Sequence, residues 1–161
     1  ADIRIISELE LALSRAGWEP DHATLLIAEC VLVYLPPEDS VALLRWFASR
    51  AERIVLVMYE QISPHDAFGK MMLENLRRRG CPLLGLEACS TCNAQVGRCL
   101  SLGWYRAEAH DLLSLYKKAL VPEERARVEK LQMLDELEQW ELIMRHYSVL
   151  LAVRESGDPD L

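Results

Sequence analysis

A long apolar run near the start of the chain constrains the fold more than any other feature. Residues 25–35 read Leu-Leu-Ile-Ala-Glu-Cys-Val-Leu-Val-Tyr-Leu, and two prolines follow. Such a run is typical of a strand that is covered on both faces, as in the parallel sheet of an α/β protein. Ligands of these sheets bind beyond the carboxyl ends of the strands. We therefore expect a strand at about 24–30 that is buried on both sides and ends at a ligand site.

Glu29 is the one charged residue inside this run. A carboxylate at the point where a buried strand ends is well placed to meet a ligand. The same spacing also suits a Glu that is paired inside the core or that faces a helix N-terminus. Tyr34 could close a pocket at this place, although a Tyr at a strand end also serves as amphipathic core filling. The spacing alone leaves both readings open.

Composition limits the classes of function. A chain of 161 residues suits one domain with a real core. Its net charge of −7 disfavours a nucleic-acid partner, because phosphate binding needs a cationic surface. No segment reaches the roughly 18 to 20 uninterrupted apolar residues of a membrane helix. The first residues lack the layout of a signal peptide. We therefore expect neither a nucleic-acid nor a membrane partner.

The five cysteines raise the question of a metal site. An odd count without a secretory signal favours reduced thiols in the cytosol. Cys89-x-x-Cys92 together with Cys99 invites a zinc interpretation, but a closed zinc site usually takes two matched pairs of ligands. No second Cys-x-x-Cys exists, and His110 has no ligand partner at helical spacing. We therefore expect these cysteines to pack as small residues and predict no metal.

The remaining patterns alternate between strand and helix. Ser7-x-x-Glu10 has the spacing of a capping box, and Ser63 precedes a first-turn proline, so each Ser is expected to cap a helix. The tail 155–161 is polar and expected to be loose. The alternation predicts an α/β sheet of the doubly wound kind. Helices are expected at about 7–16, 37–50, 63–80, 92–102 and 109–143 (with a break at Pro122), and strands at about 24–30, 54–59, 104–107 and 146–153.

Several stretches together resemble the leucine carboxyl methyltransferase family. The resemblance runs in order along essentially the whole chain. It implies the carboxyl-terminal half of such an enzyme, because none of the seven glycines forms the glycine-rich turn of a nucleotide site. The stretches are Ala1-Asp2-Ile3-Arg4, Leu26–Tyr34, Tyr59-Glu60-Gln61, Glu74–Arg79, Leu134-Asp135-Glu136 and Met144-Arg145-His146-Tyr147.

The resemblance implies a fold and an activity. The fold is half of a class I methyltransferase (Rossmann-like) sheet with added helices, so residues 1–161 would form a single partial domain without its amino-terminal, glycine-rich half. Members transfer a methyl group from S-adenosylmethionine to the terminal leucine carboxylate of the catalytic subunit of type 2A protein phosphatases. The implied cofactor is S-adenosylmethionine, the implied partner is that subunit's carboxyl-terminal tail, and we expect a cytoplasmic monomer.

The resemblance also assigns roles to individual residues. Asp2 and Ile3 match the family's Asp-Leu pair beside the adenine of the cofactor, and Glu29 matches a glutamate that contacts the cofactor. Tyr34 falls near the expected pocket mouth and is a candidate for contact with the substrate. The glycine-rich loop, the ribose-binding acid and an amino-terminal Arg for the substrate carboxylate have no counterpart here. We therefore expect a complete enzyme, and not this chain alone, to give measurable heat on titration with the cofactor.

The chemistry of such a reaction calls for no catalytic acid or base. A terminal carboxylate has a reference pKa of about 3.3 to 3.7 and is already an anionic nucleophile at neutral pH. Alignment and removal of water supply the rate. Two alternatives remain: the wybutosine-synthesising methyltransferase of transfer RNA, which typically carries a Kelch-repeat region after the same domain, and a non-catalytic interaction fragment.

Overall fold

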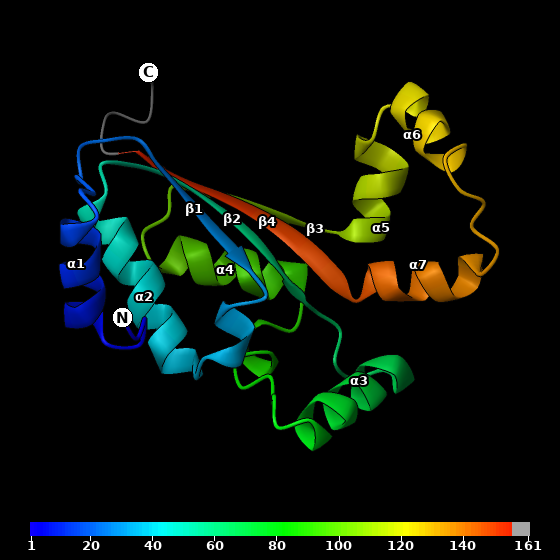
Figure 1. Ribbon diagram of the computed structural model, residues 1–161, viewed down its shortest axis with the longest axis horizontal. Helices are drawn as coiled ribbons and strands as arrows, with labels where there is room; N and C mark the ends of the chain where they lie inside the picture. Colours follow the sequence, from blue (N-terminus) through cyan, green and yellow to red (C-terminus); the bar gives the residue numbers. More distant parts are fainter. Residues whose placement is uncertain (156–161) are drawn as a thin grey trace.

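One four-stranded sheet forms the centre of the molecule. The computed structural model describes residues 1–155. The strands lie in the order β1-β2-β4-β3. β1 and β2 are parallel, and β4 runs antiparallel to both β2 and β3. Strands β1, β2 and β3 therefore end at the same edge of the sheet, and β4 begins there (Figure 1). We call this edge the carboxyl edge. The strands are β1 (Thr24–Glu29), β2 (Arg53–Gln61), β3 (Arg106–Asp111) and β4 (Tyr147–Glu155).

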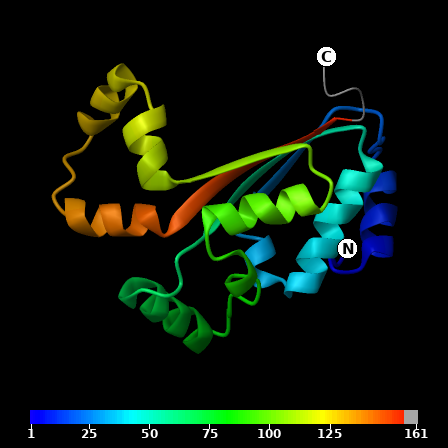
Figure 2. The same ribbon diagram turned by 180° about the vertical axis from the view of Figure 1, so that it is seen from behind.

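The helices fall into two groups. One group lies against a single face of the sheet and comprises α1 (Ile6–Arg15), α2 (Pro37–Arg50) and α4 (Cys92–Ser101) (Figures 1 and 2). The other group lies beyond the carboxyl edge and comprises α3 (Ala67–Arg78), α5 (Leu112–Ser114), α6 (Pro122–Glu129) and α7 (Leu137–Arg145). Short helical turns complete the chain: η1 (Leu32–Tyr34), η2 (Glu87–Cys89) and the π-helical η3 (Leu115–Ala119).

The core lies between the sheet and α2 and α4. Alternate residues of each strand point to opposite faces, and those of the covered face include Leu56 and Leu150, which are fully buried. Cys99 of α4 packs into the same cluster, and Cys89 is also buried. The expectation that cysteines serve as packing residues is thus confirmed for these two.

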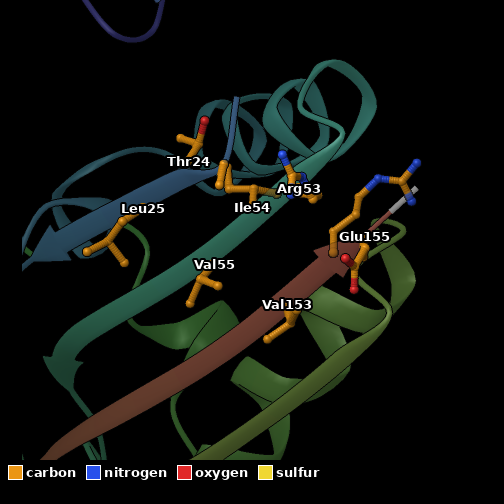
Figure 3. A pocket seen from close by; sticks show the side chains of 9 residues that line it. Thr24, Leu25, Arg53, Ile54, Val55, Val153 and Glu155 are labelled. Carbon is orange, nitrogen blue, oxygen red and sulfur yellow. The ribbon is translucent and has the colours of Figure 1, made fainter. Parts of the chain in front are cut away.

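The opposite face of the sheet is apolar and has no helix over it among the described residues. Leu25 and Ile27 are 61% and 65% exposed. Leu25 pairs with Val55, and Val55 with Val153, so the three form one row across β1, β2 and β4 (Figure 3). The expectation that β1 is buried on both faces is therefore wrong for this part of the chain. An apolar run indicates that a strand is suited to burial, but it does not indicate which element covers the strand. We call this surface the uncovered face.

Most expected elements are present, with α1, β1, α2, β2, α4 and β4 within a few residues of their expected bounds. Both expected helix caps are wrong. The N-cap of α1 is Ile5, with no side-chain cap, so Ser7 lies inside the helix. The N-cap of α3 is Asp66, whose side chain accepts a hydrogen bond from the Gly69 N–H. Ser63 instead has a positive φ of 59°, which excludes it from a helix start.

The region after residue 103 differs most from expectation. The strand expected at 104–107 is displaced to Arg106–Asp111, so the first residues of the expected helix 109–143 belong to β3. The rest of that helix is divided into α5, η3, α6 and α7, with Pro122 at the start of α6 as a first-turn proline. Glu155 of the expected tail ends β4, and 156–161 lie outside the described residues. No described helix is long and apolar enough to span a bilayer.

Candidate functional site

The end of β1 turns sharply away from the sheet. Glu29, the last residue of the strand, pairs in register with Tyr59 of β2. The next residue, Cys30, has a φ of 49°, a left-handed conformation that is uncommon for a residue with a side chain. Its backbone N–H donates to the Tyr59 carbonyl over 2.8 Å, which holds the turn against β2. The Glu29 side chain is thereby left exposed at the carboxyl edge.

A buried carboxylate fixes the turn that follows. Glu60 is only 2% exposed, and its Oε1 accepts a hydrogen bond from the Val33 N–H of η1 over 2.7 Å. Arg98 of α4 lies 4.0 Å from the other carboxylate oxygen. Burial raises the pKa of Glu60, against the opposing effects of the Val33 N–H and the Arg98 charge. The turn after β1 is therefore tied to β2 and α4 through one side chain.

Three tyrosines lie near this turn. The rings of Tyr59 and Tyr147 stack with centroids 5.2 Å apart and an interplanar angle of 10°. Burial raises the pKa of Tyr59, and Tyr147, Cys30 and Glu29 add to the effect. Burial likewise raises the pKa of Tyr34, with smaller contributions from Cys30 and Tyr147 among others. Tyr34 and Tyr59 are therefore neutral phenols at neutral pH, able to donate hydrogen bonds to an anion.

An apolar pocket lies beside the same strand end. Its volume is about 280 Å³. Ile3 lines it together with Ala28 and Val31, which stand on either side of Glu29 and Cys30 in the sequence. Leu32, Leu43, Leu44 and Phe47 complete its wall, with Leu9, Leu13, Leu26 and Ile27. The volume is close to the lower limit for small-molecule sites, roughly 300 Å³, and suits one flat apolar ring system.

Asp2 is held by its own segment. Both of its carboxylate oxygens accept hydrogen bonds from Arg4, with Oδ2 2.5 Å from a guanidinium nitrogen. The hydrogen bonds from the Arg4 side chain and backbone lower the pKa of Asp2 to about 2. The carboxylate is therefore ionised at neutral pH, and each of its oxygens accepts two hydrogen bonds from Arg4.

A second buried polar contact organises the carboxyl edge. His146 precedes β4 and is 2% exposed. Its Nε2 lies 3.0 Å from each carboxylate oxygen of Asp66, and its Nδ1 lies 2.7 Å from the Leu142 carbonyl. The backbone N–H of Gly69, followed by His146, lowers the pKa of Asp66. Helix α3 is thus attached to the start of β4.

The structure brings part of the expected site together. Ile3 reaches the residues that flank Glu29, and Tyr34 lies near Cys30, a close neighbour of Glu29 along the chain. Asp2 is held by Arg4 and Glu29 is exposed at the end of β1, and their roles toward a cofactor stay predictions. Sequence reasoning missed the supporting role of Glu60. The signal that could have found it is a lone carboxylate inside a strand that otherwise reads as buried.

Comparison with known proteins connects this arrangement to a family. A family model described as leucine carboxyl methyltransferase matches residues 1–48, which carry Asp2, Ile3 and Glu29. Leucine carboxyl methyltransferase 1 of Bos taurus is 44% identical over 158 residues, which are 98% of this chain and 47% of the bovine protein. The chain is thus similar to leucine carboxyl methyltransferases over nearly its whole length. The homologue from Arabidopsis thaliana is 40% identical over 155 residues, 96% of this chain and 47% of that protein.

The chain is also similar to a second kind of protein. The tRNA wybutosine-synthesizing protein 4 of Homo sapiens is 43% identical over 153 residues, 95% of this chain and 22% of that protein. Phosphoethanolamine N-methyltransferase 2 of Haemonchus contortus superposes with a TM-score of 0.47 and 15% identity over 86% of this chain and 35% of that one. The chain spans about half the length of the leucine carboxyl methyltransferases it matches. The expected α/β fold is confirmed for the described residues.

Proposed function

We propose that this chain forms part of an S-adenosylmethionine-dependent methyltransferase that modifies the terminal leucine carboxylate of type 2A protein phosphatase catalytic subunits. The observation that supports the proposal is the apolar pocket at the end of β1, which joins Ile3 to the residues beside Glu29. An adenine ring suits its apolar wall. The Asp2 and Glu29 carboxylates lie next to it in sequence as acceptors for amine and hydroxyl groups.

The residues present fit such a cofactor in chemical type. When bound, the cofactor would supply an electrophilic methyl group. Asp2 and Glu29 are acceptors, and a hydrogen bond to an ionised acceptor is roughly twice as strong as one to a neutral group. The Arg4 pair keeps Asp2 ionised, and the exposed Glu29 has no ion-pair partner among residues 1–155. Glu29 can therefore accept from a ligand directly, whereas a ligand donor at Asp2 would replace one of its hydrogen bonds from Arg4.

The substrate carboxylate needs to be aligned and stripped of water. The raised pKa values of Tyr34 and Tyr59 leave both phenols protonated, so either hydroxyl can donate to a carboxylate oxygen without a proton transfer. Alignment of this kind contributes up to roughly 7 to 11 kcal/mol to lowering a barrier. No general base is required, because the nucleophile is already ionised.

Glu29 lies at the end of the uncovered face, so the proposed ligand site is open on that side. Glu29 stands in the same row as Tyr59 and Val149 at the end of that face. The relatives are about twice as long as this chain. We therefore propose that the pocket described here is one side of the ligand site and that this chain alone binds ligands weakly.

Nuclear magnetic resonance of the isotopically labelled chain tests the substrate assignment. The probes are two peptides that end in leucine, one with a free carboxylate and one amidated, each added with saturating S-adenosylhomocysteine. We expect the free carboxylate to shift resonances of Tyr34 and Tyr59 and the amide to leave them unchanged. Equal shifts with both peptides would remove the terminal carboxylate from the proposal. Binding of transfer RNA in place of either peptide would favour the wybutosine-synthesising relatives.

A further inference from the structure

A polar cavity lies at the carboxyl edge on the side of β3. Its volume is about 440 Å³. It is lined by Ile62 and Ser63 after β2, by Thr91 and Cys92 at the start of α4, by Asp111, Leu113 and Ser114 at the end of β3 and in α5, and by Lys117, Lys118 and Arg145. Three cationic residues and one carboxylate residue thus line the same cavity.

That carboxylate is already occupied. Asp111 Oδ1 accepts from the Ser114 N–H over 2.8 Å, and Oδ2 accepts from the Ser114 hydroxyl over 2.6 Å. Burial alone would raise the pKa of Asp111, but the hydrogen bonds from Ser114 hold it below its ordinary value. The negative charge of Asp111 therefore serves to cap α5 and is not directed at the lysines.

The cations are incompletely neutralised. Lys117 and Arg145 share one partner, Glu141, at 2.6 and 3.3 Å. Lys118 is exposed and has no ion-pair partner among residues 1–155. The whole chain carries a net charge of −7. A cationic hollow on an acidic protein attracts anions to one place and repels them elsewhere, which favours specificity.

The cavity lies at a defined distance from the end of β1. Neighbouring strands are about 4.8 Å apart. In the order β1-β2-β4-β3, the start of β4 and the end of β3 lie two and three strand spacings from the end of β1, or roughly 10 to 14 Å. An extended polypeptide advances about 3.3 Å per residue. A peptide whose last residue lies beside Glu29 therefore reaches the cavity with the side chain three or four residues earlier.

We infer that this cavity binds an acidic side chain located three or four residues before the terminal carboxylate of the substrate polypeptide. The inference rests on the proposed function, since it assumes that the substrate's carboxyl terminus lies at the end of β1. Lys118 supplies the unpaired charge, and Lys117 and Arg145 the further donors. The chain then selects a substrate by two anions at a fixed separation.

Peptide pairs test this assignment on the labelled 161-residue chain. Each pair ends in leucine with a free carboxylate and carries either Asp or Asn three residues before that leucine. We expect the Asp peptide to bind about five-fold more tightly at low salt, the size of effect of an exposed ion pair. Lys118→Gln removes the difference. Lys70→Gln, on exposed α3, is the matched control and keeps it. Lys118→Glu makes a Lys-containing peptide the tighter ligand.

The outcomes separate this inference from the function on which it rests. Equal affinities of the Asp and Asn peptides, with binding still dependent on the terminal carboxylate, overturn the acidic subsite alone. A preference for Asp that survives Lys118→Gln places the subsite elsewhere and also overturns the assignment. Loss of dependence on the terminal carboxylate overturns the proposed function, and failure of both peptides to bind contradicts both.

Discussion

Replacement of Glu60 tests whether one buried carboxylate fixes the turn after β1. Glu60→Ala removes the acceptor of the Val33 N–H and leaves Arg98, whose side chain is 10% exposed, without its carboxylate. Loss of one partner of a buried pair costs about 3 to 5 kcal/mol. We expect a loss of that size in the free energy of unfolding at pH 7, measured by urea denaturation with tryptophan fluorescence.

Glu60→Gln separates the hydrogen bond from the charge. The amide oxygen can still accept a hydrogen bond from the Val33 N–H, the side chain still fills its place beside Arg98, and the cost of burying the carboxylate charge disappears, so we expect a change within about 1.5 kcal/mol. The raised pKa of Glu60 means that the folded state favours the protonated acid, so the wild type gains stability from this group as pH falls through that pKa. Glu60→Gln lacks this gain.

An exposed carboxylate supplies the control. Glu29→Ala, one strand away, should change the free energy of unfolding by no more than about 0.5 kcal/mol. A Glu60→Ala variant as stable as Glu29→Ala, or a Glu60→Gln variant as unstable as Glu60→Ala, would refute the reasoning. The first result would mean that the turn is held without Glu60, and the second that the charge itself is essential.

Three further predictions concern packing and pH. A Cβ on Gly69 would clash with the Ser63 carbonyl oxygen, so Gly69→Ala should lower the free energy of unfolding by at least about 2 kcal/mol. Gly97 has open space around it, so Gly97→Ala in α4 should raise the free energy of unfolding by about 0.5 to 1 kcal/mol. Paired urea titrations check both values. Ile27→Thr on the uncovered face should lower fluorescence of a bound hydrophobic dye and change stability by less than about 0.5 kcal/mol, whereas the buried Leu56→Ala should cost about 2 to 5 kcal/mol. Because the pKa of Asp66 is lowered from 3.8, its stabilising effect is present above that value and lost as pH falls through the lowered pKa, so acid denaturation of Asp66→Asn should lack this component; an unchanged acid transition would contradict it.

The strands and helices with clear periodicity could be predicted because their signal is local. The apolar run of β1 and the buried stripe of α2 are examples. The bounds of β3 could not be predicted, because its half-buried residues include two alanines and its alternation of apolar and polar residues is weak. Its pairing with β4 decides its structure. The cap of α3 was equally hidden, since Asp66 is held by His146, which lies 80 residues later.

The candidate site was predictable only in part. Glu29 could be singled out as a lone charge in an apolar run, and its cofactor role, like those of Asp2 and Ile3, stays a prediction from the family resemblance. The left-handed conformation of Cys30 and the hydrogen bond from η1 to Glu60 depend on the pairing of β1 with β2. No local sequence pattern predicts that pairing. The uncovered face was likewise invisible, because composition shows that a surface is apolar and not what lies over it.

The central claim is that the end of β1 and the segment around Ile3 contact the cofactor. Titration of the labelled chain with S-adenosylhomocysteine, followed by nuclear magnetic resonance at millimolar ligand, tests it most directly. We predict weak binding, with chemical-shift changes confined to residues 2–3 and 28–32. Glu29→Gln should reduce the affinity several-fold, and the control Glu52→Gln should leave it unchanged. Shifts located elsewhere, or shifts in these residues that Glu29→Gln leaves intact, would contradict the account.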